Sequence, residues 1–182
     1  YDEEKGAYID TYASGRRNVT RHANIFAILY DFADESKRAS IVRNVLDNDG
    51  VPAITTPYFK FFELWANCKL GRVEKMLDQV RDYWGGMLAL GATTIWEEYD
   101  PRQTFPGHYA MYGDLFGKSL CHAWGAGPID LIGRYVAGFR AEAPGCRAFA
   151  LEPRPSGLSA LDNVIPLPNG GQVQLCWDER EL

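Results

Sequence analysis

The chain has 182 residues and a net charge of −5, from 19 basic and 24 acidic residues. No basic run and no apolar run of membrane-spanning length occurs in it, so neither a nucleic-acid partner nor a membrane partner is predicted. Hydrophobic residues make up 46% of the chain, which is enough for one sizeable core. The aromatic content of 13% exceeds what such a core needs and favours a site for a carbohydrate or an aromatic ligand.

The cysteine and histidine patterns argue against metal and redox chemistry. The four cysteines are scattered without a CxxC pair, and we expect them to be free and largely buried. The three histidines lack the spacing of a metal-binding motif, and no GxSxG or P-loop sequence occurs. We therefore expect no metal and no cofactor. Because the chain opens on Tyr1 without an initiator methionine, we also expect it to be a piece of a longer protein.

The first half of the chain predicts helices that alternate in burial. After an irregular stretch over residues 1–20, residues 22–33 are apolar almost all round the helical period, which predicts a helix buried on most faces. The next segment has a cap at Asp34 and a single apolar stripe, as in a surface helix. A third helix is predicted to begin at Thr56-Pro57, with the threonine hydroxyl as its cap, and to end at Gly71.

The second half predicts a helix, a long loop and a further helix. Apolar residues at helical spacing predict a fourth helix from Arg72 to about Leu90, with a bend or an end at Gly85-Gly86. A long loop follows over residues 97–117. A last helical region is predicted from about residue 118 to residue 136, with interruptions at its glycines.

Helical periodicity stops near residue 140. Beyond it, apolar residues alternate with a period of two, and residues 169–171, Asn-Gly-Gly, are typical of a hairpin turn. We expect about three strands, with Val173, Leu175 and Trp177 on one face, and these are too few to stand alone. The predicted division is residues 1–140 as helical hairpins and residues 141–182 as a small antiparallel β-sandwich segment. Repeated αα-hairpins with long loops at one end fit about half of an α/α toroid.

Glu97 is the leading candidate for chemistry. It follows a Gly-Ala-Thr-Thr break and Trp96, and a carboxylate beside an indole suits a sugar, whose apolar face packs on an aromatic plane. Inverting glycoside hydrolysis needs two carboxyl groups roughly 6.5–9.5 Å apart, one ionised to activate water and one protonated. Adjacent residues normally point apart, so Glu97 and Glu98 are not expected to form this acid–base pair. Glu97 is favoured over Glu98 as the functional residue, with Asp100 behind both. The alternative is that these acids are solvated loop residues and Trp96 is a core side chain.

His122 and the aromatic run after residue 57 are weaker candidates. His122 lies in SLCHAWGAGP, where a lone histidine is either a satisfied core residue or a ligand-binding one. His108 and His22 carry less weight still. Most of the aromatic run is core in character, and only members near the helix start, such as Tyr58, are placed to reach a pocket.

Three blocks of the sequence resemble the catalytic domain of α-L-rhamnosidases of glycoside hydrolase family 78. The blocks are TTPYFKF at 55–61, YWGGMLALGATTIWEEYDP at 83–101 and SLCHAWGAGP at 119–128. They occur in the family's order and with fitting intervals. The middle block is the most specific, because GATTxWE after a WGxM helix is hard to produce by chance. The resemblance covers nearly the whole chain.

The resemblance implies a fold, an activity and a set of site residues. The fold is mainly α, part of an (α/α)₆ barrel followed by the start of a C-terminal β-sandwich. The activity is inverting hydrolysis of terminal α-L-rhamnose from glycosides or polysaccharides. Glu97 is implied as the general base and His122 as a sugar contact. Trp84, Trp96 and Tyr58 fall at or beside positions that line the sugar pocket.

Departures from the family pattern limit what the resemblance implies. Ala123-Trp124 stands where many members have Tyr-Ala, and Glu98-Tyr99 replaces a commoner Arg-Trp, so a different subsite preference is expected. The family's general acid lies in the first half of the barrel, upstream of Tyr1. We therefore expect the chain to need the missing N-terminal half of the same protein as its partner and to be inactive alone.

Two other functions stay open at this point. One is a non-catalytic carbohydrate-binding module with the same toroid. The other is an α/α-barrel glycosidase or lyase that acts on a different sugar, because a fold does not determine a substrate. An acid-rich loop in the upstream sequence would favour catalysis over binding alone.

Overall fold

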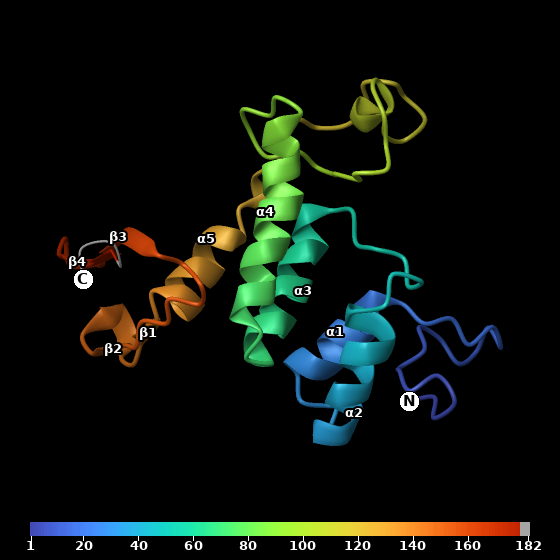
Figure 1. Ribbon diagram of the computed structural model, residues 1–182, viewed down its shortest axis with the longest axis horizontal. Coiled ribbons are helices and arrows are strands. Elements are labelled where there is room, and N and C mark those ends of the chain that lie inside the picture. The colour runs from blue at the N-terminus through green and yellow to red at the C-terminus, as the bar shows by residue number, and fades with distance from the viewer. Residues whose placement is uncertain (179–182) are drawn as a thin grey trace.

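The computed structural model describes residues 1–178, in which helices are followed by short strands. In Figure 1, α3 and α4 lie side by side at the centre, α1 and α2 lie toward the N-terminus, and α5 leads to the strands near the C-terminus. The α-helices are α1 (Arg21–Leu29), α2 (Glu35–Ile41), α3 (Pro57–Lys69), α4 (Val73–Ala89) and α5 (Pro128–Leu131). The shorter helical turns are Val42–Leu46 and Ile132–Val136, which are π-helical, and Gly107–Tyr109, Ala123–Gly125 and Pro144–Cys146, which are 3₁₀.

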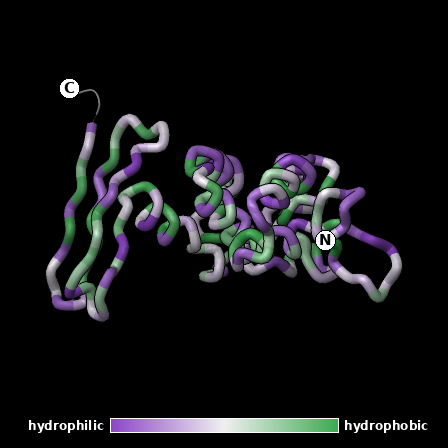
Figure 2. The backbone as a smooth tube through the Cα atoms, turned by 90° about the horizontal axis from the view of Figure 1, so that it is seen from below, coloured by the Kyte–Doolittle hydropathy of each residue, from purple (hydrophilic) through white to green (hydrophobic). Residues whose placement is uncertain are grey.

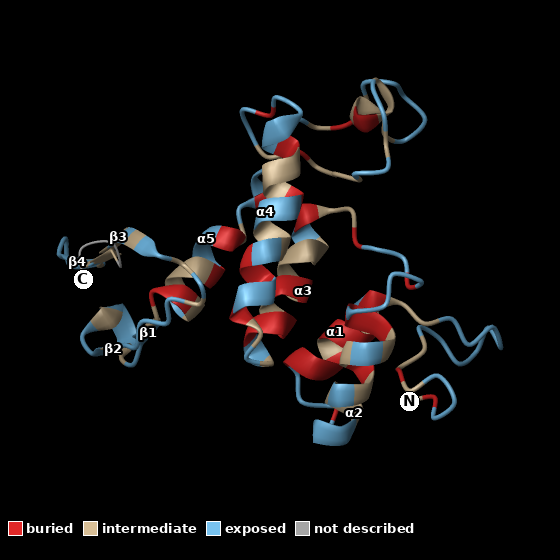
Figure 3. Cartoon of the chain, in the orientation of Figure 1, coloured by how far each residue is buried: buried red, intermediate tan, exposed pale blue. Residues whose placement is uncertain are grey.

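The core follows α3, which contacts α1 on one side and both α4 and α5 on the other. One cluster of buried apolar side chains joins α1, the α2 region and α3, with Ile28 and Ile41 fully buried within it. A second cluster joins α3, α4 and α5 around Leu64, Met76 and Leu131. Figure 3 shows the buried residues on the facing sides of these helices, whereas the strands are mostly half-buried or exposed. The helical body therefore holds the core.

The sequence predicted both ends of α3 and of α4 to within one or two residues, but it misplaced the end of α1. The Asp34 side chain accepts a backbone N–H of the first turn of α2 at 2.9 Å, as predicted for a cap. Pro57 occupies the first turn of α3 as predicted, although the Thr56 hydroxyl makes no capping hydrogen bond. The first helix ends at Leu29, before its predicted end at residue 33, because Asp31 adopts a left-handed backbone with a φ of 60°.

The sequence predicted a bend or an end of the helix at Gly85-Gly86, and the predicted end is wrong. Helix α4 continues through both glycines to Ala89. The reason lies outside the helix, because a Cβ atom at Gly86 would lie 2.2 Å from the hydroxyl oxygen of Tyr99. The Tyr99 ring also packs edge-on against Tyr83, with ring centroids 5.4 Å apart. Glycine at position 86 thus lets the loop after α4 approach the helix closely.

Because of this close approach, alanine is expected to affect stability differently at the two glycines. Gly85→Ala should stabilise the protein by about 1 kcal/mol, since alanine favours a helix and a Cβ at position 85 meets nothing within 4 Å. Gly86→Ala should be less stable than Gly85→Ala by about 1–3 kcal/mol, the cost of overpacking against Tyr99. Urea unfolding of both variants measures the difference. Equal stability of the two variants would show that the Tyr99 contact does not constrain α4.

The predicted helical region over residues 118–136 is only partly helical. Helix begins at Pro128, and the preceding residues contain just one 3₁₀ turn. His122 has an extended backbone, with φ −122° and ψ 93°, and its N–H donates to the carbonyl of Ile95 at 2.8 Å rather than within a helix. Pairing with a distant segment therefore overrides the local helical pattern.

The strands of the described residues form two separate antiparallel pairs. They are β1 (Phe139–Ala141) with β2 (Phe149–Leu151), and β3 (Ala160–Pro166) with β4 (Gln172–Asp178). Figure 2 shows these strands at one end of the chain, beside the helical body. Val173, Leu175 and Trp177 are half-buried on one face of β4, as predicted, and Gly170 takes a φ of 84° in the hairpin turn. Residues 179–182 of the predicted segment 141–182 lie outside the described residues.

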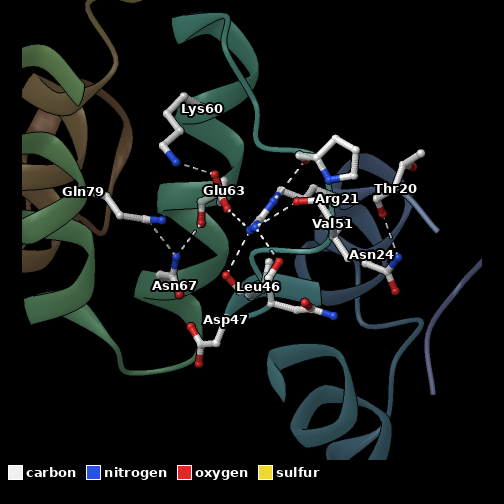
Figure 4. Close-up of polar contacts among 12 residues, drawn as sticks. Thr20, Arg21, Asn24, Leu46, Asp47, Val51, Lys60, Glu63, Asn67 and Gln79 are labelled. Carbon is white, nitrogen blue, oxygen red and sulfur yellow. Dashed lines mark hydrogen bonds and ion pairs between the residues drawn. The ribbon is translucent and has the colours of Figure 1, made fainter. Parts of the chain in front are cut away.

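A buried ion pair ties α1 to α3. The guanidinium of Arg21 donates to the Glu63 carboxylate at 2.7 Å, and the two side chains are only 7% and 1% exposed. Arg21 also donates to backbone carbonyls of the segment that leads into α3 (Leu46, Asn48, Val51 and Pro52). The Lys60 ammonium lies 2.7 Å from the other Glu63 oxygen, so this one carboxylate pairs with two cations. Figure 4 shows this network between the two helices.

The four cysteines are free thiols, as predicted, but they are not largely buried. Only Cys68 is buried, and its burial raises its pKa to about 12. Cys121 and Cys176 are exposed and Cys146 is half-buried, which contradicts the predicted burial. No helix among residues 1–178 has both the length and the apolar character needed to cross a bilayer.

Candidate active site

The three sequence blocks meet in space in the loop that caps the end of α4. The segments around residues 95–97 and 119–122 run side by side, with Glu97 N–H donating to the Ser119 carbonyl at 2.9 Å and His122 N–H donating to that of Ile95 at 2.8 Å. Tyr99 N–H donates to the Thr55 carbonyl at 2.8 Å and so joins the first block to the second. Figure 1 shows this long loop beyond the end of α4. Residues far apart in the sequence thereby form one site.

Glu97 lies half-buried at the centre of this arrangement, and both of its carboxylate oxygens have a donor. The Tyr112 hydroxyl donates to Oε1 at 2.7 Å, and the Ser119 backbone N–H donates to Oε2 at 3.0 Å. One donor per oxygen fixes the plane of the carboxylate. Each oxygen keeps a second lone pair for another donor, such as a water molecule.

The surroundings of Glu97 favour its ionised form. The Tyr112 hydrogen bond and the Ser119 backbone hydrogen bond hold the pKa of Glu97 below its ordinary value, and the charges of His122 and Lys118 act in the same direction. Partial burial opposes these effects without cancelling them. The Glu97 side chain therefore stays ionised to lower pH than a free glutamate. An ionised, positioned carboxylate is suited to accept a proton from water, which is the role of a general base.

Glu98 points away from Glu97, as predicted for adjacent residues. Its Oε1 accepts the Thr55 hydroxyl at 2.9 Å, and its Oε2 lies 3.4 Å from the ammonium of Lys118. The Lys118 side chain is 0% exposed and also donates to the carbonyl of His108 at 2.8 Å. Glu98 thus neutralises a buried lysine and ties the loop to the start of α3.

His122 is half-buried beside two exposed aromatic rings. Its ring lies edge-on to Trp124, with centroids 5.7 Å apart, and Trp124 in turn contacts Tyr58 at 5.3 Å. The Trp124 side chain is 69% exposed and that of Tyr58 is 43% exposed. An exposed aromatic ring near a carboxylate and an imidazole is suited to a sugar ring. The sugar contacts predicted for His122 and Tyr58 stay predictions.

Trp84 supports the turn that carries His122. Its indole N–H donates to the Gly125 carbonyl at 2.9 Å. Gly125 itself is packed so closely that a Cβ atom would lie 2.1 Å from Ile95 and 3.1 Å from Pro57. Residues of all three sequence blocks therefore pack closely against one another at this turn. A direct contact of Trp84 with a sugar stays a prediction.

Trp96 is buried in the core of the loop rather than exposed beside Glu97. It is 3% exposed and stacks on the His108 ring, with an interplanar angle of 3° and centroids 6.0 Å apart. Tyr109 packs edge-on against the same indole at 5.6 Å. In this position Trp96 braces the segment that carries Glu97. A role for it in sugar binding also stays a prediction.

Two donors to Glu97 were not identified from the sequence. Ser119 lies in the third sequence block, but its donor is the backbone N–H, which any residue except proline supplies. Tyr112 stands fifteen residues after Glu97 in a loop, and no sequence pattern pairs the two. Among residues 1–178, no group of three or more metal-ligating side chains gathers in one place.

The chain is similar to solved structures of rhamnosidases. The crystal structure of a glycoside hydrolase family 78 rhamnosidase of Bacillus sp. GL1 matches with a TM-score of 0.82 and 32% identity, over 98% of this chain and 19% of that one. A rhamnosidase from Klebsiella oxytoca with rhamnose bound matches with a TM-score of 0.64 and 30% identity, over 74% of this chain and 25% of that one. No protein-family model matches the chain, and no curated protein sequence matches it.

The chain thus spans about a fifth of the Bacillus protein and about a quarter of the Klebsiella protein. Within that span, the fold of the Bacillus protein matches 98% of this chain, and 32% of the residues are identical. The resemblance predicted from the three sequence blocks is therefore confirmed, and the chain is related over nearly its whole length to the rhamnosidases of glycoside hydrolase family 78.

Proposed function

We propose that the chain is the base-bearing part of an inverting α-L-rhamnosidase that releases terminal rhamnose from glycosides or polysaccharides. The observation that carries the proposal is the ionised Glu97 carboxylate, held by Tyr112 and Ser119 next to His122. The relation to rhamnosidases supports rhamnose as the sugar. In this reaction Glu97 accepts a proton from water while the water oxygen attacks the anomeric carbon. The glycosidic bond breaks, and its oxygen takes a proton from a general acid.

The general acid is proposed to lie outside this chain. Inversion requires a second carboxyl group roughly 6.5–9.5 Å from the base, on the opposite side of the sugar. The nearby acids are engaged elsewhere, because Glu98 pairs with Lys118 and Asp100 pairs with Arg102 at 2.6 Å. The missing N-terminal half of the same protein would supply the acid. The 182-residue chain alone is therefore expected to be inactive.

The arrangement of helices supports a partial (α/α)₆ barrel as the setting of this site. Helices α1, α3 and α5 form a row in which α3 contacts both neighbours. Helix α4 also packs on α3, and we assign it as an outer helix of the toroid. We propose that residues 1–140 form this part of the barrel and that residues 141–182 begin a C-terminal β-sandwich. The start of α3 and the loop after α4, which hold the site, would then open at one end of the barrel.

The sugar is proposed to bind between Glu97 and the aromatic residues around it. His122 would donate or accept a hydrogen bond with a sugar hydroxyl, and Tyr58 would pack on the apolar face of the ring. Trp84 and Trp96 would shape the pocket behind them. The exposed pair of Trp124 and Tyr58 also suits a module that binds sugar without hydrolysing it, which is the second candidate function.

The stereochemistry of hydrolysis tests this proposal. In a polypeptide that contains the chain together with its upstream half, an aryl α-L-rhamnoside should yield β-L-rhamnose as the first product, because water attacks from the side opposite the leaving group. Proton NMR spectra recorded within the first minutes distinguish the anomers before they equilibrate. The 182-residue chain by itself is the control and should release no aryl group.

Two outcomes would contradict the proposal. If α-L-rhamnose appears first, the reaction retains configuration, and Glu97 is not the base of an inverting mechanism. If the longer polypeptide binds rhamnose without hydrolysing any rhamnoside, the second candidate function is correct.

A further inference from the structure

Tyr112 stands at a backbone position that its residue type disfavours. Its φ is 55° and that of the following Gly113 is 83°, so both central residues of the turn are left-handed. Met111 and Asp114 close this turn with reciprocal N–H···O hydrogen bonds of 3.0 Å. Turns with two left-handed central residues favour Asn, Asp or Gly, and a bulky side chain there is strained. The second position has the favoured glycine, but the first has tyrosine.

Burial does not explain the tyrosine. The side chain is 79% exposed, and within residues 1–178 no other aromatic ring packs against it. The contact that it does make is the hydroxyl donation to Glu97 Oε1 at 2.7 Å. A strained position that is kept without a packing gain points to a functional contact.

The turn is built to hold this hydroxyl in place. Gly117 lies so close to the base of the turn that a Cβ atom there would be 2.3 Å from the Met111 carbonyl oxygen. Gly117 is followed by Lys118, whose N–H donates to the Tyr109 carbonyl at 3.2 Å, and then by Ser119, the other donor to Glu97. The two donors thus come from the two arms of one loop, and each binds a different carboxylate oxygen.

We propose that Tyr112 is a positioning residue for Glu97, which fixes the carboxylate so that its free lone pairs face the attacking water. This proposal rests on the proposed function, since it deepens the account of the same site. The charged and titratable groups that face Glu97 are Tyr112, His122 and Lys118, and Glu98 acts on the Tyr112 hydroxyl from the neighbouring position. Of these, Tyr112 makes the direct side-chain hydrogen bond.

The contact also affects the titration of both partners. A hydroxyl that donates to a carboxylate favours the ionised acid and the neutral phenol, so it lowers the pKa of Glu97 and raises that of Tyr112. Removing the hydroxyl should therefore raise the pKa of Glu97. The acid limb of the pH profile, below which the base is protonated, should move to higher pH.

Tyr112→Phe tests the proposal, with Tyr12→Phe as its control because Tyr12 is 92% exposed and is not among the groups that act on Glu97. In the 182-residue chain, carbon NMR of the labelled glutamate carboxyls should record a higher pKa for Glu97 in Tyr112→Phe and no change in Tyr12→Phe. In the longer, active polypeptide, Tyr112→Phe should lower kcat by about tenfold with little change in KM, as for a lost hydrogen bond to a charged group. Its acid limb should move to higher pH.

A second variant separates positioning from general damage to the loop. Tyr112→Asn removes the same contact but suits the left-handed turn, so its melting midpoint should lie above that of Tyr112→Phe. Its kcat should nevertheless be as low as that of Tyr112→Phe. If the unmutated polypeptide is active but both variants keep its Glu97 pKa and its pH profile, the positioning role of Tyr112 is overturned. Absence of all rhamnosidase activity in the unmutated polypeptide would instead overturn the proposed function, while the NMR titration would still decide the Tyr112 contact.

Discussion

Glu97→Gln is expected to lower kcat for an aryl α-L-rhamnoside by about 10²–10⁴-fold in the polypeptide that supplies the general acid. The amide cannot take a proton from water, so the chemical step loses its base. The geometry of the site should survive, because the glutamine carbonyl can still accept the Ser119 N–H while its NH₂ group donates to the Tyr112 oxygen. KM should change little, since proton transfer belongs to the transition state. With a nitrophenyl α-L-rhamnoside as the substrate, the release of nitrophenol measures both kcat and KM.

Glu74→Gln is the matched control, because Glu74 is exposed in the first turn of α4, away from the loop that carries Glu97. It should leave kcat unchanged. Thermal melting of both variants checks that neither has lost its fold. If Glu97→Gln hydrolyses the substrate as fast as the unmutated protein, Glu97 is a solvated loop acid and not the base.

The sequence could predict those features of the candidate site that depend on residue types within one short stretch. Glu97 follows a specific signature, and its divergence from Glu98 follows from the geometry of adjacent residues. What the sequence could not provide was which distant groups reach the carboxylate. The Tyr112 hydroxyl arrives through a strained turn, and the Ser119 backbone N–H carries no sequence signal at all.

The same limit explains the errors in the predicted fold. Gly86 reads locally as a helix breaker, whereas its role is to admit Tyr99. The stretch around His122 has a helical pattern, but its backbone pairs with Ile95 instead. In each case a contact between segments distant in sequence outweighs local propensity.

The second large effect is expected at the buried ion pair between α1 and α3. Arg21 and Glu63 are almost completely shielded from water, and the guanidinium fork also satisfies carbonyl groups of the segment that precedes α3. Removing one partner of such a pair leaves the other charge buried without compensation, which costs about 3–5 kcal/mol. A whole domain is stabilised by only about 5–15 kcal/mol. Loss of this pair should therefore bring the chain close to unfolding.

Glu63→Gln is expected to lower the free energy of unfolding by about 3–5 kcal/mol, because the amide cannot balance the charges of Arg21 and Lys60. Urea unfolding followed by circular dichroism measures the loss. The control is Asp78→Asn, which breaks the Arg81–Asp78 pair on α4, whose side chains are 56% and 65% exposed. That exposed pair should contribute at most about 1 kcal/mol.

A double-mutant cycle with Arg21→Met then tests whether the loss comes from the pair itself. Once Glu63 is replaced, Arg21→Met should cost less than it does in the unmutated protein, because the charge that it removes is no longer needed. Additive losses would mean that Arg21 acts through its carbonyl contacts alone. If Glu63→Gln costs no more than Asp78→Asn, water reaches the pair, and packing rather than charge holds α1 against α3. The position of α1 beside the site-bearing helix α3 would then depend on the apolar cluster around Ile28.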